Sequence, residues 1–345
     1  MKRLFISMLV LSLAFTALAQ HKSANRCTIP DFLQPGDRIA LISPSYHTDI
    51  TNIDTAAIVL RQWGYEPVIG AFVDSLHRGS YAGDAQQRLS DIRWALNDPD
   101  VKAIICNRGG YGTIHLADMI EPGEFAAHPK WLVGFSDITT LLAMETCDGV
   151  MGIHGTIGAH IAKNHGRDTN SILLRELLEG RIPEYRLPSH PLNTKGKGTG
   201  ILVGGNLCTI APLIGTSADP TREGDIILFL EEVEESYHNI DRLFNMLILT
   251  GVIDRCKGII LGEFTDCGAD LEWESPEEMI CSYLKGRDIP VICGFPAGHG
   301  NINLPLIMGA RTTIKVKGCG ASLSFCIRGD KHRIDTAGIT GQEED

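Results

Sequence analysis

The chain has 345 residues, enough for two ordinary domains, and its hydrophobic fraction of 43% excludes disorder for the bulk of it. The formal net charge is −11 and no stretch carries a basic stripe, so nucleic acid is not an expected partner. Ten cysteines are scattered without a Cys-x-x-Cys pair, which excludes the usual ligand spacing of a metal site. Several lie in apolar runs, and we interpret most of them as small buried side chains, although disulfides are the alternative in an exported protein.

The N-terminal segment has the pattern of a secretory signal peptide. Two basic residues precede an apolar stretch at 4–19, which ends in Ala-Leu-Ala, the small-x-small pattern of a cleavage site. This stretch is short for a membrane span, and no later stretch is long and apolar enough to cross a bilayer. We therefore expect residues 1–19 to be removed, the mature chain to start near Gln20, and the protein to be exported to the periplasm.

Strand-like and helix-like patterns alternate in the first half of the chain. Apolar runs predict buried strands at 38–43, 101–106 and 131–135. Apolar residues at helical spacing predict helices at 53–60, 84–96 and 137–146. This alternation predicts a mostly parallel sheet covered on both faces, in an N-terminal α/β domain at 28–165.

The pattern weakens between the two halves. Prolines and a Lys-Gly-Lys-Gly run at 166–199 are typical of a connection between domains. A smaller C-terminal α/β domain is expected at 200–339. Its predicted elements are strands at 201–206, 225–230, 257–261 and 290–293, a helix with its apolar face at 240–248, and a closing hairpin at 312–327.

Ser136 stands where an apolar strand ends and a helix begins, in Gly-Phe-Ser-Asp-Ile-Thr. Open α/β folds place their sites at this edge of the sheet, where a helix N-terminus also stabilises a developing oxyanion. The segment is not Gly-x-Ser-x-Gly, because Ile138 takes the last position. From this motif alone, a simple helix N-cap is a better explanation of Ser136 than a nucleophile is.

A glycine-rich segment, Asn-Arg-Gly-Gly-Tyr-Gly at 107–112, follows another predicted strand. It matches neither the dinucleotide-binding fingerprint nor the lysine-containing phosphate loop. A backbone N–H donor beside a reacting carbonyl, a phosphate-binding loop and a tight turn are all compatible with these glycines.

Two further segments carry polar residues directly after predicted strands. Glu231 opens an acidic run that can orient a histidine, pair with a second carboxylate as in glycosidases, or form a charged loop. His299 is flanked by glycines that allow a close approach. His154 and His160 are six residues apart, which is not the spacing of a helical metal pair, so we expect them to be structural.

Taken together, the ordered motifs resemble the serine L,D-carboxypeptidase family, which includes muramoyltetrapeptide carboxypeptidases and microcin-immunity peptidases. The matching pieces are GDRIALISPS, NRGGYG, VGFSDIT, GGNL, the LEE…Y..IDR stretch at 230–242 and GHGNINLPLIMG at 298–309. They span nearly the whole mature chain in family order. The resemblance implies a flavodoxin-like or amidotransferase-like N-terminal domain, a C-terminal domain that supplies Glu and His, and a site in the cleft between them. Homodimers are common in the family.

The resemblance also implies roles for individual residues. Ser136 would be the nucleophile, His299 the base, and Glu231 the residue that orients it, with Glu232 as the rival for that last role. The oxyanion hole would use the backbone N–H groups of Gly110 and Asp137. No metal or organic cofactor is required by this chemistry.

The implied substrate is a muropeptide or another cell-wall peptide that ends in D-Ala. An arginine would suit recognition of its free carboxylate, and Arg108 and Arg311 are candidates by position. A peptide antibiotic is a related possibility for an exported member. Two other classes compete with this interpretation: a binding protein that captures a muropeptide without turnover, and a glycosidase that uses Glu231 with another carboxylate.

Overall fold

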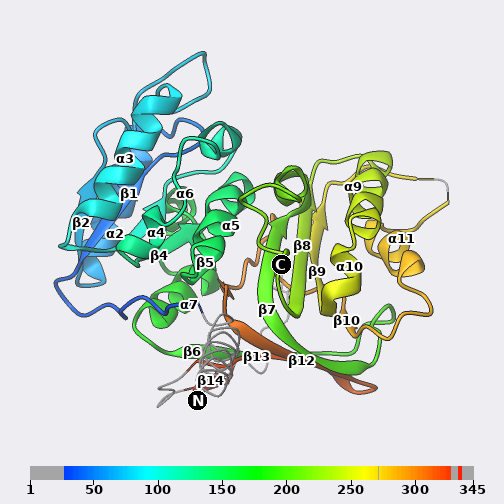
Figure 1. Ribbon diagram of the computed structural model, residues 1–345. Coiled ribbons are helices and arrows are strands. Elements are labelled where there is room, and N and C mark those ends of the chain that lie inside the picture. The colour runs from blue at the N-terminus through cyan, green and yellow to red at the C-terminus, as the bar shows by residue number, and fades with distance from the viewer. Residues whose placement is uncertain (1–26, 271, 328–332, 336–345) are drawn as a thin grey trace, which may run out of the picture.

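The computed structural model describes residues 27–270, 272–327 and 333–335, so the signal peptide expected at 1–19 lies outside the described residues. Two β-sheets stand side by side, one built mainly from the first half of the chain and one from the second (Figure 1). The two-domain α/β architecture expected from the sequence is confirmed. Within the described ranges, no helix has both the length and the hydropathy that crossing a bilayer requires.

The first sheet has six strands in the order β11-β5-β4-β3-β1-β2. They are β1 (Arg38–Ile42), β2 (Glu66–Ile69), β3 (Val101–Cys106), β4 (Trp131–Gly134), β5 (Gly152–His154) and β11 (Leu306–Met308). The five strands from the first half run parallel, as predicted, whereas β11 pairs with β5 in the antiparallel sense. Leu306 pairs with His154, so the segment just before β11, which carries His299, is held at the carboxyl edge of this sheet.

Six helices accompany the first sheet and the crossing to the second. They are α2 (Ile50–Gln62), α3 (Ala85–Asn97), α4 (Glu124–Ala127), α5 (Thr139–Cys147), α6 (Gly158–Lys163) and α7 (Thr169–Leu178). The predicted start of α3 is confirmed by a capping box, in which Asp84 accepts from the backbone of Gln87 and the Gln87 side chain accepts from the backbone of Asp84. Helix α5 contacts both β5 and the longest strand of the second sheet, β7 (Gly196–Asn206).

The second sheet has eight strands in the order β10-β9-β8-β7-β12-β13-β6-β14. Besides β7 they are β6 (Ile182–Leu187), β8 (Ile226–Val233), β9 (Cys256–Thr265), β10 (Val291–Ile292), β12 (Arg311–Lys317), β13 (Gly320–Phe325) and β14 (Arg333–Asp335). The helices on this side are α8 (Leu207–Ile210), α9 (Tyr237–Leu249), α10 (Val252–Arg255) and α11 (Pro276–Tyr283). Strands β7 to β10 run parallel, and β12 and β13 form the predicted antiparallel hairpin.

The segment expected to connect the domains, 166–199, is largely folded. Helix α7 buries an apolar face against the core, and β6 pairs with β13 on one side and β14 on the other. The sequence did not predict β6, because proline is normally confined to edge strands or bulges. Here Pro183 lies inside β6, in register with Ile334.

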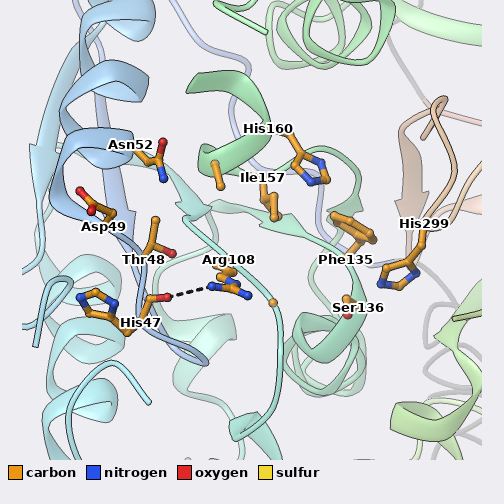
Figure 2. A pocket seen from close by; sticks show the side chains of 12 residues that line it. His47, Thr48, Asp49, Asn52, Arg108, Phe135, Ser136, Ile157, His160 and His299 are labelled. Carbon is orange, nitrogen blue, oxygen red and sulfur yellow. Dashed lines mark hydrogen bonds between the residues drawn. The ribbon is translucent and has the colours of Figure 1, made fainter. Parts of the chain in front are cut away.

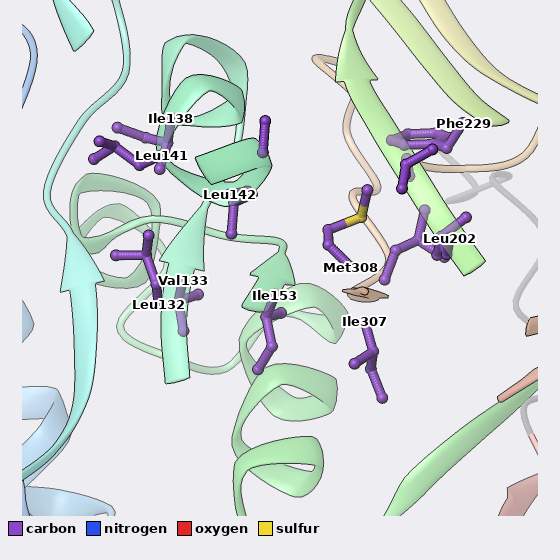
Figure 3. Close-up of a cluster of buried hydrophobic side chains, with 14 of the residues drawn as sticks. Leu132, Val133, Ile138, Leu141, Leu142, Ile153, Leu202, Phe229, Ile307 and Met308 are labelled. Carbon is purple, nitrogen blue, oxygen red and sulfur yellow. The ribbon is translucent and has the colours of Figure 1, made fainter. Parts of the chain in front are cut away.

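One continuous hydrophobic core joins the two sheets (Figure 3). Figure 3 draws the part where the two sheets meet, with side chains from the first sheet and its neighbouring helices and from β7 and β8 of the second. The labelled side chains are Leu132, Val133, Ile138, Leu141, Leu142, Ile153, Leu202, Phe229, Ile307 and Met308. At the end of β7, the Asn206 backbone N–H donates to Thr139 Oγ1 at 3.2 Å. Since close-packed interiors resist small shifts, this shared core fixes the carboxyl edges of the two sheets relative to each other.

Candidate active site

Ser136 lies at a strained junction between β4 and the short 3₁₀ helix that leads into α5. Its φ angle is 62°, a left-handed conformation that non-glycine residues rarely adopt and that tends to persist at functional sites. The N-cap interpretation is wrong: Phe135 occupies the N-cap of the 3₁₀ helix and Ile138 that of α5. A sharp strand-to-helix turn therefore presents the Ser136 hydroxyl at the carboxyl edge of the sheet, although the Gly-x-Ser-x-Gly motif is absent.

Ser136 and His299 line the same pocket, although 163 positions separate them in the sequence. The pocket has a volume of about 570 Å³ (Figure 2). Its lining residues are His47, Thr48, Asp49, Asn52, Arg108, Gly109, Phe135, Ser136, Ile157, Ala159, His160 and His299. The ring of Phe135, the neighbour of Ser136, packs against the His299 ring with 4.9 Å between centroids. The first sheet thus supplies the hydroxyl and most of the walls, and the loop before β11 supplies the imidazole.

A buried carboxylate holds the His299 imidazole. Nδ1 of His299 lies 2.7 Å from Oε2 of Glu231, which ends the apolar run of β8 and is fully buried. Gly298 makes this approach possible, because its φ is +140° and a Cβ there would lie 3.0 Å from Oε2 of Glu231. A glycine before the histidine is therefore a steric requirement of this pair.

Both partners of this contact have a raised pKa, for different reasons. Burial is the largest influence on His299 and opposes its charged form, but the hydrogen bond and charge of Glu231 outweigh it together with more distant carboxylates, so the pKa of His299 is raised. Burial also raises the pKa of Glu231, and contact with His299 only partly offsets that rise. Stabilising the charged form in this way suits an imidazole that must gain and lose a proton.

Glu232, the neighbouring carboxylate, has other partners. Its Oε1 accepts from the Asn206 side chain at 2.7 Å, and its Oε2 accepts from the Cys208 backbone at 2.7 Å. These bonds tie the end of β8 to the end of β7 and the start of α8. Of the two glutamates that the sequence left as rivals, it is Glu231 that contacts His299.

The glycine-rich segment packs directly against the serine. A Cβ on Gly109 would lie 3.2 Å from Oγ of Ser136, and one on Gly110 would lie 2.4 Å from the Tyr46 ring. Gly110 also has a φ of +116°, which disfavours any residue with a Cβ. These constraints place main chain, rather than side chains, beside the Ser136 hydroxyl.

Asp137 ties together the three loops that surround Ser136. Its carboxylate accepts from the Ser45 hydroxyl at 2.6 Å and from the Thr113 backbone N–H at 2.9 Å, and its carbonyl accepts from the Thr113 hydroxyl at 2.6 Å. These partners follow β1 and β3, and Asp137 itself follows β4. The Asp137 carboxylate is therefore occupied in holding the backbone around the site.

The two candidate arginines lie in different places. Arg108 lines the pocket, where Nη1 donates to the His47 carbonyl at 3.4 Å (Figure 2). Arg311 begins β12 in register with Ile201, is exposed, and is not among the residues that line this pocket. The structure brings only Arg108 to the serine and the histidine.

Several pocket residues were not singled out from the sequence. His160, expected to be structural, lines the pocket, and burial is the main cause of its lowered pKa. His47, Thr48, Asp49 and Asn52 lie at the start of α2 and form the wall at the far end from His299 (Figure 2). The run SPSYHTD after the first predicted strand was the available signal, since it also ends at the carboxyl edge of the sheet. Within the described ranges, no group of three or more metal-ligating side chains is spaced to hold a metal ion.

Comparison with known proteins identifies the family. Residues 39–155 match the N-terminal domain of LD-carboxypeptidases, and residues 199–314 match their C-terminal domain. The murein tetrapeptide carboxypeptidase of Pseudomonas aeruginosa is 31% identical over 283 residues, covering 78% of this chain and 91% of that protein. A probable murein peptide carboxypeptidase of Bacillus subtilis is 30% identical over 292 residues, covering 83% and 91%.

Solved structures agree with the sequence comparison. The crystal structure of the muramoyltetrapeptide carboxypeptidase from Oxalobacter formigenes superposes with a TM-score of 0.76 at 27% identity, covering 84% of this chain and 99% of that one. The glycosidase and pure binding-protein interpretations lose their support, because these relatives are peptidases matched along almost their whole length. The chain belongs to the LD-carboxypeptidase family and is a serine-type carboxypeptidase.

Proposed function

We propose that the protein releases D-Ala from peptidoglycan tetrapeptides by cleaving its amide bond to the preceding L-centre, diaminopimelate or lysine. Ser136 would be the nucleophile, His299 the general base and acid, and Glu231 the residue that orients His299. The observation that carries this proposal is that His299, bound to a buried glutamate, lines the same pocket as a strained serine. Such a nucleophile, base and orienting carboxylate is the arrangement that acyl transfer requires.

In the first step His299 takes the Ser136 proton while the serine oxygen attacks the substrate carbonyl. Because Nδ1 of His299 is engaged by Glu231, the other ring nitrogen is the one left for this transfer. His299 then gives the proton to the departing D-Ala nitrogen, and water hydrolyses the acyl-enzyme by the reverse exchange.

Backbone N–H groups of Gly110 and Asp137 would hold the oxyanion. Their support is positional: Gly110 belongs to the main chain packed against Ser136, and Asp137 opens the helical segment after the nucleophile. The three hydrogen bonds of Asp137 to Ser45 and Thr113 fix this backbone before substrate arrives, which is the condition for electrostatic preorganisation.

Arg108 is our candidate for binding the free carboxylate of the terminal residue. It follows a strand of the same sheet, lines the pocket and precedes the glycine that touches Ser136. A guanidinium binds a carboxylate through two parallel hydrogen bonds, which lysine cannot reproduce. Recognition of a free terminus beside the nucleophile would make the enzyme an exopeptidase. The signal-like pattern at 1–19 supports export, which would bring it next to the cell wall.

The test compares the mature protein with its Ser136→Ala form on a tetrapeptide that ends in diaminopimelate-D-Ala. Released D-Ala is measured by mass spectrometry. We expect release by the parent and a loss of at least about 10⁴-fold in the variant. Ser90→Ala, an exposed serine on α3, is the matched control and should leave the rate unchanged. Equal release by the parent and Ser136→Ala would refute the nucleophile.

A second candidate substrate is a peptide antibiotic. The microcin self-immunity protein MccF of Escherichia coli is 28% identical over 265 residues, covering 68% of this chain and 76% of that protein. Measuring kcat/KM for the tetrapeptide and for the microcin with the same enzyme preparation decides between the two. A higher value for the microcin would replace the cell-wall assignment while leaving the catalytic residues in place.

A further inference from the structure

Two of the ten cysteines lie side by side, away from the pocket. Cys281 is on α11, and Cys293 directly follows β10. Their sulfur atoms are 3.5 Å apart. All ten cysteines fall within the described residues, and this is the one pair there whose sulfur atoms are in contact. The interpretation of most cysteines as buried side chains is wrong. Of the other eight, three are buried (Cys106, Cys256, Cys267), two are half-buried (Cys27, Cys208) and three are exposed (Cys147, Cys319, Cys326).

We propose that Cys281 and Cys293 form a disulfide when the protein meets a small-molecule disulfide or a thiol-oxidising catalyst. A disulfide has its sulfurs at about 2.05 Å, so they must approach by about 1.5 Å, a movement shared between two side chains. One of these side chains lies on a short helix and the other at the end of a two-residue strand, where neither is fixed by neighbours on a long ladder.

The two thiols differ in solvent exposure, which indicates which of them reacts first with an external disulfide. Cys281 is half-buried and Cys293 is buried. The hydrogen bond with Cys293 lowers the pKa of Cys281, and the same bond raises the pKa of Cys293. Cys281 is thus the thiol better placed to meet an external disulfide, since the thiolate is the attacking species.

The exchange balances in two steps. The Cys281 thiolate attacks one sulfur of oxidised glutathione, which forms a mixed disulfide and releases one glutathione. The Cys293 sulfur then attacks Cys281, which forms the protein disulfide and expels the second glutathione together with the Cys293 proton. Two electrons and two protons leave the protein, and one molecule of oxidised glutathione becomes two of the reduced form.

The bond would anchor the segment that leads to His299. The Cys293 backbone N–H already donates to Asn193 Oδ1 at 2.8 Å, and the Phe295 backbone N–H donates to the Leu261 carbonyl at 3.0 Å. His299 follows six residues after Cys293. A covalent tie to α11 would add a third fixed point to this segment, outside the pocket. A periplasmic location, expected from the signal-like N-terminus, is a compartment in which such bonds persist.

The experiment treats the purified mature protein with either dithiothreitol or oxidised glutathione, then blocks free thiols under denaturing conditions and digests with trypsin. Lys285 and Arg287 lie between the two cysteines, so trypsin separates them onto different peptides. We expect one linked pair of peptides in the oxidised sample, assigned to Cys281 and Cys293 by fragment ions, and none after reduction. Free blocked thiols at both positions in the oxidised sample would overturn the proposal, as would a link that joins other cysteines.

Thermal unfolding provides the second readout. The oxidised parent should unfold about 5 °C above the reduced parent, because a short loop is closed in the unfolded chain. Cys281→Ser should show no difference between the two treatments, whereas Cys319→Ser, which removes an exposed thiol, should keep the parent's difference. Equal midpoints for the oxidised and reduced parent would refute the anchoring role.

Discussion

Nδ1 of His299 lies 2.7 Å from Oε2 of Glu231, although 68 positions separate them in the chain. The glutamate lies near the end of β8 in the second sheet and is fully buried, and the loop before β11 carries the histidine to the edge of the first sheet. This contact joins β8 of the second sheet to the loop that reaches the first sheet, at the point where the proposed proton transfer occurs. It also raises the pKa of His299 against the opposing influence of burial.

The first prediction concerns the pH dependence of the reaction. A general base must be neutral, so activity should fall as the pH drops through the raised pKa of His299. In Glu231→Gln the charge that raises this pKa is gone, and the acid limb of the kcat/KM profile should move to lower pH. The plateau should also fall by roughly 10³–10⁴-fold, because the orientation of the imidazole and the stabilisation of its charged form are lost.

Glu223→Gln is the control for that experiment. It removes the same charge from an exposed position outside the pocket, and its profile should overlay that of the parent. An acid limb that stays in place in Glu231→Gln would mean that the limb does not report His299.

The second prediction concerns Gly110. In Gly110→Ala the new methyl group meets the Tyr46 ring at 2.4 Å and is strained at a φ of +116°, so the loop beside Ser136 must move. Loss of an oxyanion donor costs about 10²–10³-fold in kcat, and we expect a fall of that size in single-turnover rates.

Gly123→Ala is the control that distinguishes the effect of backbone strain from the effect of a changed loop beside Ser136. Gly123 has a φ of +93°, and a Cβ there meets nothing within 4 Å. It should therefore lose stability through backbone strain while its kcat stays close to the parent value. If both glycine variants keep the parent kcat, the loop at 107–112 has no part in catalysis.

The sequence allowed much of the fold to be predicted, because most of it is encoded locally. Buried runs ending at Ile42, Cys106 and Gly134 are continuous and apolar, which is the pattern of central parallel strands. Strands β5 and β11 have only three residues each, too few for any period to emerge. The pairing of β11 with the first sheet is a long-range contact that no local pattern in the chain encodes.

The residues of the candidate site also divide into those that local sequence indicates and those that depend on long-range packing. Ser136, Glu231 and His299 could be named because each stands directly after a buried strand or among glycines, in motifs that resemble a family. His160 and the start of α2 could not, because their place in the pocket depends on how α2 and α6 pack against each other. The choice between Glu231 and Glu232 likewise needed coordinates, since adjacent residues in a strand point to opposite faces.

The third prediction tests recognition of the free carboxylate. Arg108→Ala should lower kcat/KM by roughly 10–100-fold on the tetrapeptide, the size expected for a hydrogen-bonded charge. A tetrapeptide that ends in D-Ala amide should be poor for the parent and no poorer for the variant, because the arginine has no carboxylate to bind. Arg311→Ala, outside the pocket, is the control and should behave like the parent on both substrates. If Arg108→Ala lowers kcat/KM equally for the tetrapeptide acid and the tetrapeptide amide, Arg108 does not bind the terminal carboxylate.

The last prediction concerns His154, which is fully buried beneath the site between Phe135 and Phe229. Burial, with a smaller contribution from His299, lowers its pKa from 6.5 to about 3. Below pH 6.5 the imidazole is therefore protonated in the unfolded chain but stays neutral in the folded protein. The free energy of unfolding falls as the pH drops from 6.5 towards 3. At pH 5 this one group should cost about 2 kcal/mol relative to pH 8. Denaturant titrations should give the free energy of unfolding of the parent and of His154→Phe at both pH values. Its change between pH 8 and pH 5 should be larger in the parent by that amount, whatever the variant's overall stability. An identical change in both proteins would mean that His154 is protonated in the folded protein.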